Sequence, residues 1–263
     1  NLFAQQQLTL AESKELALKN NNRICKAKED VIATQSDKLI ADVAGRPKLD
    51  ASATAFYFGE PLNTMLPEYG FAPMVSVTQP IYTGGKIKYG KQMAETNIQM
   101  SNAQQRLVED EVLLATETAY WLLVQAKEEI KLEQQVKKQL ASHYTFLNNQ
   151  FGAGLIYKND VLRAKVLQNE NEARLQAAEN KLILAKRRLS QLIGMEDPTG
   201  IDVADTLSTG DFSKQGVLDA VDANRPEIEL ATNGIKMSQL TKSMLKADLK
   251  PSVGLSLNGM AAF

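Results

Sequence analysis

The sequence predicts a mainly helical chain with a few β-strands, and three observations support this fold class. Between about Lys86 and Gln150 there is no proline and only one glycine, so a single helix of roughly 65 residues is expected, about 95 Å long at 1.5 Å per residue. Three shorter segments alternate apolar and polar residues with the period of a strand. A pattern of about 200 residues also begins to recur near the end of the chain.

Composition excludes several classes of function. Lys and Arg total 30 and Asp and Glu total 31, and this balance argues against nucleic acid as a partner. The single Cys25 and single His143 cannot form a His/Cys metal site, and no metal or cofactor is expected. Cys25 is interpreted as a small apolar residue that fills space in the core. Glu128 and Glu129 are adjacent in a helix and do not face each other, so they do not form an acid/base pair. No other residue pattern indicates an enzyme. No apolar run of about 18 residues predicts a transmembrane helix.

The N-terminal region, residues 1–46, is expected to contain one helix from about Thr9 to Val43. Thr9 followed by Glu12 is a capping-box pattern at its start. The sequence Gly45-Arg46-Pro47 is expected to end it, because proline cannot continue a helix.

Residues 47–84 are expected to form a β-hairpin, with strands at about Lys48–Phe58 and Met74–Tyr82 and a long loop between them. Small polar residues occupy one face of each strand. The apolar face is expected to carry Leu49, Ala51, Ala53, Ala55, Tyr57, Val75, Val77 and Ile81.

Residues 85–193 are expected to form a long antiparallel helical hairpin, with a tight reversal at Phe151–Asn159 and a returning helix at Asp160–Ile193. Heptad spacing supports the first helix at Met93, Met100, Leu107, Leu114 and Trp121, and later at Leu140, Tyr144, Leu147 and Phe151. The returning helix has the heptad pairs Val161/Ala164, Gln168/Asn171, Leu175/Ala178, Leu182/Ala185 and Leu189/Leu192.

The rest of the chain begins to repeat its start. Residues 194–248 are expected to be a connector followed by helices at about Ser213–Ala223 and Pro226–Lys246, and residues 249–263 to begin another strand. As Arg46-Pro47 leads into the first strand, Lys250-Pro251 leads into this one. We therefore expect the sequence to be a fragment that holds one repeat and the start of a second.

Several motifs, in this order and spacing, resemble the TolC family of outer-membrane efflux channels. They are Leu8-Thr9-Leu10-Ala11, Ala17-Leu18-Lys19-Asn20-Asn21, Arg46-Pro47-Lys48-Leu49, Val77-Thr78-Gln79-Pro80-Ile81-Tyr82-Thr83-Gly84-Gly85, Gly152-Ala153-Gly154-Leu155, Asn159-Asp160-Val161-Leu162-Arg163-Ala164, Asn224-Arg225-Pro226-Glu227 and Leu249-Lys250-Pro251-Ser252.

The resemblance implies a homotrimer in the outer membrane of a Gram-negative bacterium. Each protomer would give four strands to one shared transmembrane β-barrel, and the helices would continue it as a periplasmic tube. The implied role is a passive conduit for small molecules or proteins in a tripartite efflux or type I secretion system. Its partners would be a periplasmic adaptor protein, an inner-membrane transporter and outer-membrane lipid.

Two sets of site residues follow from this resemblance. The adaptor-docking helical tip would comprise Gly152, Gly154, Leu155, Asp160, Val161, Leu162 and Ala164. The aromatics Phe56, Tyr57, Phe58 and Tyr82 lie near strand ends, where a membrane-interface girdle is expected. Asn159 or Asp160 can also serve simply as the cap of the returning helix.

Two other functions fit part of the sequence. A periplasmic adaptor also contains a long helical hairpin, but it places several strands on both sides of the hairpin, whereas helices follow the hairpin here. A soluble coiled-coil scaffold with a half-buried sheet would show the same strand alternation. A need for detergent separates a channel from a scaffold.

Overall fold

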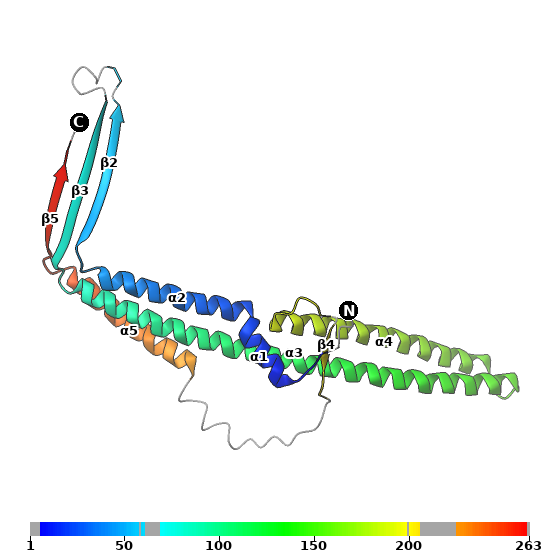
Figure 1. Cartoon of the computed structure of the whole chain (residues 1–263). Coiled ribbons are helices and arrows are strands. Elements are labelled where there is room, and N and C mark those ends of the chain that lie inside the picture. The colour runs from blue at the N-terminus through cyan, green and yellow to red at the C-terminus, as the bar shows by residue number, and fades with distance from the viewer. Residues whose placement is uncertain (1–5, 58, 61–68, 199, 206–224, 262–263) are drawn as a thin grey trace. The chain divides into compact units, whose positions relative to one another are not determined.

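The computed structural model describes residues 6–57, 59–60, 69–198, 200–205 and 225–261, and Figure 1 labels most of their helices and strands. The chain divides into two compact units. The first contains residues 1–28 and 105–223, and the second contains residues 29–104 and 224–263. Within the described part, no helix is both long and apolar enough to cross a membrane.

A three-stranded antiparallel sheet in the second unit has the order β2-β3-β5. Its strands are β2 (Lys48–Tyr57), β3 (Tyr69–Tyr82) and β5 (Val253–Met260). The strand β3 begins five residues before the expected Met74, because Tyr69–Pro73 continue the ladder with β2 as far as the pair Tyr57 and Tyr69. The predicted loop was therefore too long at its C-terminal end.

The register of the sheet separates an apolar face from a polar one. Leu49, Val77 and Leu257 form one cross-strand row. The adjacent row is Asp50, Ser76 and Asn258, which lies on the opposite face because side chains alternate along a strand. The predicted alternation is therefore confirmed, and the large apolar residues Leu49 and Leu257 are exposed.

Close contacts fix the turns where this sheet meets its helices. The Gln79 side chain donates a hydrogen bond to the Gly45 carbonyl oxygen over 3.0 Å. Gly84 has φ +63°, and a Cβ there would lie 2.6 Å from the Ala247 carbonyl oxygen, so only glycine fits. An ion pair joins Lys86, at the start of α3 (Lys86–Gly152), to Asp248, directly after α5 (Pro226–Ala247).

The predicted long helix and hairpin are present. The helix α3 has 67 residues, about 100 Å at 1.5 Å per residue, and it is followed by α4 (Lys158–Ile193). The returning helix thus starts two residues before the expected Asp160. Of the heptad residues predicted on α4, all are buried or half-buried in the structure. The helix predicted at 213–223 lies outside the described residues.

The core of the first unit joins four helices to a short parallel strand pair, β1 (Gln6–Leu8) and β4 (Ile201–Val203). The fully buried core comprises Leu8, Ala17, Ile24, Val112, Ala119, Tyr120, Leu123, Val124, Leu189, Ile193, Ile201 and Val203. The sevenfold spacing predicted on α3 was wrong at Leu114, which is 67% exposed, and at Trp121, which is 37% exposed, because Tyr120 and Leu123 occupy the core instead. Of the residues predicted nearer the turn, Leu140, Tyr144 and Leu147 are half-buried and Phe151 is exposed.

The single N-terminal helix predicted from Thr9 to Val43 is broken into α1 (Leu10–Asn20) and α2 (Asn22–Val43). Asn21 is extended, with ψ 125°, and its side chain both accepts from the Arg23 N–H and donates to the Leu192 carbonyl oxygen. This tertiary hydrogen bond explains the break. The Thr9 capping box is confirmed, whereas Cys25 is exposed on α2 and fills no apolar space.

Candidate functional site: the helical tip and the two-faced sheet

The tip of the hairpin is a helix C-terminal motif closed by a left-handed glycine. The Leu155 N–H donates to the Gln150 carbonyl oxygen over 3.0 Å, and the Gly154 N–H donates to the Phe151 carbonyl oxygen over 2.9 Å. These two bonds, with Gly154 at φ +74°, are the pattern of a Schellman motif with glycine at the C′ position. The requirement for Gly154 is thus a backbone requirement of the turn.

The returning helix begins without a side-chain cap. Tyr157 is the N-cap residue of α4 and makes no capping hydrogen bond through its side chain. The prediction that Asn159 or Asp160 caps this helix was wrong, because the helix starts at Lys158 and both residues already lie inside its first turn. The half-buried Asp160 carboxylate there interacts favourably with the positive end of the helix dipole.

The structure divides the predicted tip residues into two groups. Val161 and Ala164 are 8% and 3% exposed and belong to the buried heptad seam of α4, so they support the hairpin from inside. Leu155 and Leu162 are 72% and 50% exposed. A Schellman motif usually packs its C″ residue against the preceding helix, yet Leu155 is exposed and the C3 residue is the polar Gln150.

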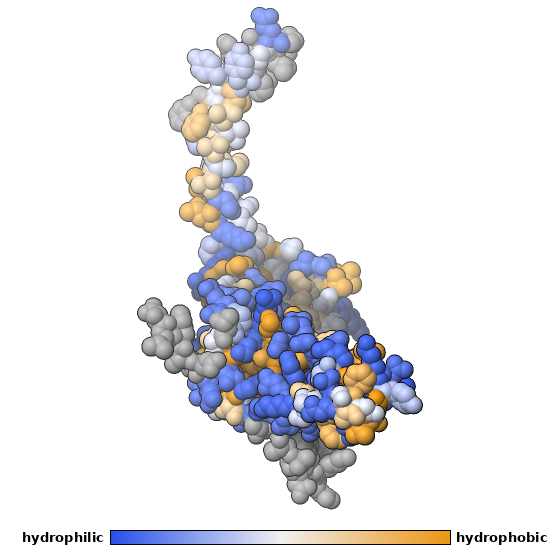
Figure 2. Space-filling model, turned by 90° about the vertical axis from the view of Figure 1, so that its right-hand side faces the viewer, coloured by the Kyte–Doolittle hydropathy of each residue, from blue (hydrophilic) through white to orange (hydrophobic). Residues whose placement is uncertain are grey.

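The surface of the tip also includes residues that sequence reasoning missed. Tyr157 is 84% exposed and Val166 is 55% exposed. A shallow hollow of about 540 Å³ on α4 is lined by Asn159, Leu162, Arg163, Val166 and Leu167. Figure 2, which looks toward this end of the hairpin, shows apolar patches set among hydrophilic side chains. The exposure of Val166 could have been inferred from its position outside the α4 heptad pairs.

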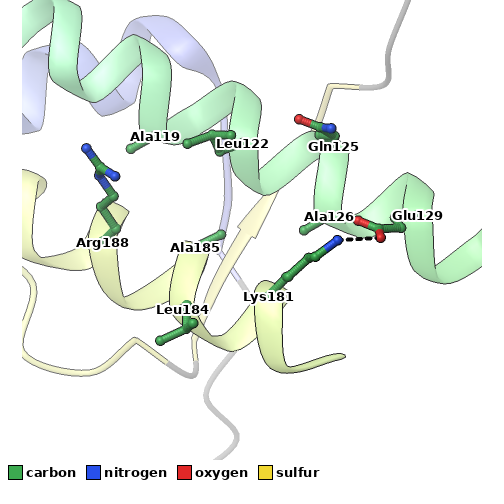
Figure 3. Close-up of a pocket in the computed structure, with 9 residues that line it drawn as sticks. All are labelled: Ala119, Leu122, Gln125, Ala126, Glu129, Lys181, Leu184, Ala185 and Arg188. Atoms are coloured by element: carbon green, nitrogen blue, oxygen red, sulfur yellow. Dashed lines mark hydrogen bonds and ion pairs between the residues drawn. The ribbon is translucent and has the colours of Figure 1, made fainter. Parts of the chain in front are cut away.

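A second apolar hollow lies between α3 and α4, far from the tip in sequence. It measures about 360 Å³ and is lined by Ala119, Leu122, Gln125, Ala126, Glu129, Lys181, Leu184, Ala185 and Arg188 (Figure 3). The Lys181 ammonium pairs with the Glu129 carboxylate over 2.6 Å on one side of it. Leu122 is 42% exposed and Leu184 is 64% exposed, so this hollow is an apolar surface bordered by charges.

Three of the four predicted girdle aromatics lie within the described sheet, and Phe58 lies outside the described residues. Tyr57 pairs with Tyr69 at one end of the β2–β3 ladder, whereas Tyr82 pairs with Val253 at the other end of β3. The Phe56 ring lies across Gly70, where a Cβ would collide with it. Tyr69 and Phe71 also lie on β3, but they were not predicted as girdle residues because the sequence pattern placed them in the loop.

A polar cluster fastens β4 to α3 in the first unit. The Lys127 ammonium donates to the Asp202 carboxylate over 2.6 Å and to the Val203 carbonyl oxygen over 2.9 Å. Burial alone would raise the pKa of Asp202, but the hydrogen bonds from Lys127 and the Val203 backbone, with the charges of Lys127 and Lys186, outweigh it and hold that pKa below its usual value. The buried Tyr120 hydroxyl donates to Asp205 over 2.7 Å, and burial together with this carboxylate raises the Tyr120 pKa.

A sheet with one exposed apolar face and a long helical hairpin are the features expected of outer-membrane channel proteins with helical extensions. The chain belongs to the outer membrane efflux protein family, whose model matches residues 14–195. It is accordingly an outer-membrane protein of the Gram-negative type whose helices extend into the periplasm.

Solved channel structures share this fold at low sequence identity. The CmeC outer membrane channel of Campylobacter jejuni matches with a TM-score of 0.78 and 15% identity, over 97% of this chain and 60% of that one. VceC of Vibrio cholerae matches with a TM-score of 0.75 and 16% identity, over 97% and 67%. The open-state MtrE channel of Neisseria gonorrhoeae matches with 0.67 and 17% identity, over 97% and 62%.

The chain therefore spans 60–67% of the length of these channels. No curated protein matches it. The family favours a channel over the adaptor and the soluble scaffold that the sequence left open.

Proposed function

We propose that the chain is part of an outer-membrane export channel, a passive conduit for small molecules or proteins in a tripartite efflux or type I secretion system. The observation that carries this proposal is the two-faced sheet. Its strands have 10, 14 and 8 residues, and a tilted transmembrane strand needs about 9–11. The apolar row Leu49, Val77 and Leu257 suits lipid, and the polar row Asp50, Ser76 and Asn258 suits a water-filled interior.

Three copies of the protein would complete the conduit. Among the described residues, β2 pairs only with β3, which leaves a strand edge that lipid cannot satisfy by hydrogen bonding. The hollow around Leu122 and Leu184 offers an apolar surface for the helices of a neighbouring protomer. A homotrimer that closes one barrel and one helical tube would bury both features.

The tip would dock a periplasmic adaptor that connects the channel to an inner-membrane transporter. The exposed Leu155, Tyr157 and Leu162 support this role, because they are large apolar side chains at the end of a rigid hairpin. Gly152 and Gly154 contribute open space beside them, since a Cβ on either would meet no atom within 4 Å.

A matched pair of substitutions in β5 tests the conduit. Leu257→Arg places a charge on the apolar face and should cost about 2–4 kcal/mol if that residue lies at the bilayer midplane. Ser256→Arg places the same charge on the polar face, one residue away, and should be tolerated. The measurement is the amount of full-length protein recovered in outer membranes and its conductance in planar bilayers. Equal recovery and conductance of the two variants would exclude this orientation of the sheet.

A further inference from the structure

The three strands of the sheet in the second unit contain only two charged residues, Lys48 and Asp50, and both belong to β2. These residues stand two positions apart in the strand. Because side chains alternate between the two faces of a sheet, both charges lie on the same face. The described strands therefore carry one cation and one carboxylate, on a single face.

The register shows that this is the polar face. Lys48 pairs with Thr78, which in turn pairs with Ser256. Asp50 belongs to the adjacent row of that face, the polar row that suits a water-filled interior. Both side chains are exposed, and no described residue pairs with either of them. In the proposed conduit, both charges would therefore line the interior.

Three-fold symmetry would turn these two residues into two charged rings. Each copy of the protein contributes one ammonium and one carboxylate, at the same two levels of the barrel. Lys48 is the first residue of β2, at the end of the strand that follows α2. Asp50 lies about 7 Å further along the strand, at about 3.4 Å per residue. A ring of positive charge would thus stand next to a ring of negative charge.

The separation of the two rings decides how a solute in the interior experiences them. At physiological ionic strength the field of a charge extends about 8 Å into solution, slightly more than the separation of about 7 Å along the strand. The two fields therefore overlap, and they largely cancel because the charges are equal in number and opposite in sign. The other residues of these rows, such as Thr78 and Ser76, are uncharged and leave the balance undisturbed.

We propose that Lys48 and Asp50 together make the barrel wall indifferent to the charge of the solute that passes, and that either residue alone would make it selective. Lys48 prevents the carboxylate ring from favouring cations, and Asp50 prevents the ammonium ring from favouring anions. This inference rests on the proposed conduit and adds the two residues that set the charge selectivity of its described wall. Such a wall suits exported molecules of either sign.

Reversal potentials in planar bilayers test this balance. The full-length protein is compared under a KCl gradient with the single variants Lys48→Gln and Asp50→Asn. Lys48→Gln leaves the carboxylate ring alone, so the permeability of K⁺ relative to Cl⁻ should rise at least about twofold in dilute salt of about 0.01 M. Asp50→Asn should change the same ratio by a similar factor in the opposite direction.

Two double variants are the matched controls. Lys48→Gln/Asp50→Asn removes both charges, and Lys48→Asp/Asp50→Lys exchanges them. Both keep the net charge of the face at zero and should retain the permeability ratio of the unmodified protein. The shifts of the single variants should fade in about 1 M KCl, where the Debye length is about 3 Å. Single variants that leave the ratio unchanged, or that change it in the same direction, would overturn the charge balance.

Cysteine accessibility separates this inference from the proposed conduit. The exposed Cys25 is first replaced in Cys25→Ser, and Asp50→Cys or Ala51→Cys is added to that variant. A water-soluble cationic thiol reagent should react with Asp50→Cys and lower the conductance, but not with Ala51→Cys on the apolar face.

The two experiments fail in different ways. If Ala51→Cys is the more reactive variant, or if the full-length protein forms no conducting channel, the proposed conduit is wrong and the charge balance falls with it. If Asp50→Cys reacts as expected but the single-charge variants do not shift the reversal potential in opposite directions, the conduit stands and only the charge balance is wrong.

Discussion

Gly154 shows how one backbone angle determines the shape of the tip. Its φ of +74° lies in the left-handed region, where a residue with a Cβ is strained, although the surrounding space is open. Gly152, two residues earlier, is helical and equally open. A Cβ at either glycine would meet no neighbouring atom, so a difference between substitutions at Gly154 and Gly152 reports backbone strain and not steric crowding.

We expect Gly154→Val to destabilise the hairpin by about 1–2 kcal/mol and to abolish export while trimers still assemble. Gly152→Ala should be neutral or stabilise by about 0.5–1 kcal/mol, because alanine is the better helix former. Urea unfolding followed by circular dichroism gives the stabilities, and an export assay in cells that lack the native protein gives the function. Normal export by Gly154→Val would remove the docking role of this turn.

Asp202 provides a prediction about pH. Its folded-state pKa is lowered, in part through Lys127. The ion pair therefore stabilises the folded protein at pH values above the unfolded-state pKa near 3.8, and this stabilisation is lost as the pH falls through the lower folded-state pKa. Both side chains are partly exposed, and this reduces the contribution to about 1 kcal/mol.

Lys127→Met should therefore lower stability by about that amount at neutral pH, and the deficit relative to the unmodified protein should shrink below about pH 4. Lys138→Met, at an exposed lysine of the same helix, is the control and should change little. Thermal unfolding from pH 3 to pH 7 measures both. A deficit that stays constant down to pH 3 would mean that Asp202 is not the group responsible.

At the scale of elements, the seam between α3 and α4 contains a polar layer in which one buried oxygen atom accepts no hydrogen bond from the described residues. Asn171 is 1% exposed, and its amide nitrogen donates to the Glu133 carboxylate over 2.5 Å and the Glu133 carbonyl oxygen over 3.3 Å. Its Oδ1 is buried and accepts no hydrogen bond from the described residues. Such layers generally cost stability and specify which residues pack together.

We expect the double variant Asn171→Leu/Glu133→Leu to equal or exceed the stability of the unmodified protein, since it removes both polar partners. Glu133→Leu alone removes the carboxylate acceptor of the buried Asn171 amide and leaves it only the longer bond to the carbonyl oxygen of residue 133, which should cost about 1–3 kcal/mol. Denaturant titration of the three proteins gives the free energies of unfolding. If the double variant were the least stable of the three, the layer would be a source of stability.

The sequence predicted an element well where one seam decided its packing. Every predicted heptad residue of α4 is at least half-buried because that helix packs along a single regular seam. In α3 the buried positions do not keep the spacing of seven residues. That spacing predicted Trp121 as a core residue, although its neighbour Tyr120 is the one that is fully buried. Tertiary contacts with β1 and β4 decide that position, and strands of three residues give no periodic signal.

The candidate site was predicted less completely than the fold. The sequence located the turn and its glycine, because glycine has a distinct backbone requirement. It did not separate the inward-facing Val161 from the outward-facing Leu162, since that depends on which side of α4 meets α3. It also placed the helix start at Asp160, where a favoured capping residue stands, whereas packing starts the helix without a side-chain cap.

For the whole molecule, the proposed trimer predicts that the hollow between α3 and α4 is covered on assembly. Leu184→Arg places a charge in it next to Arg188 and should prevent association of full-length protomers in detergent. Gln176→Arg, at an exposed position of α4 outside the hollow, should still assemble. Analytical ultracentrifugation distinguishes the two. Trimers of Leu184→Arg as abundant as those of Gln176→Arg would place the protomer contact elsewhere.

One side of β2 pairs with no strand among the described residues, and in the proposed barrel this has a consequence for biogenesis. Backbone amides without hydrogen-bond partners are costly in hydrocarbon, so a single protomer would not insert stably into the bilayer before it associates with other protomers. Insertion and subunit association would then have to be a single event, whose rate rises steeply with the local concentration of chains. Until that event the exposed strand is a template for misassembly, and cells would need to keep the newly exported polypeptide shielded from its own copies.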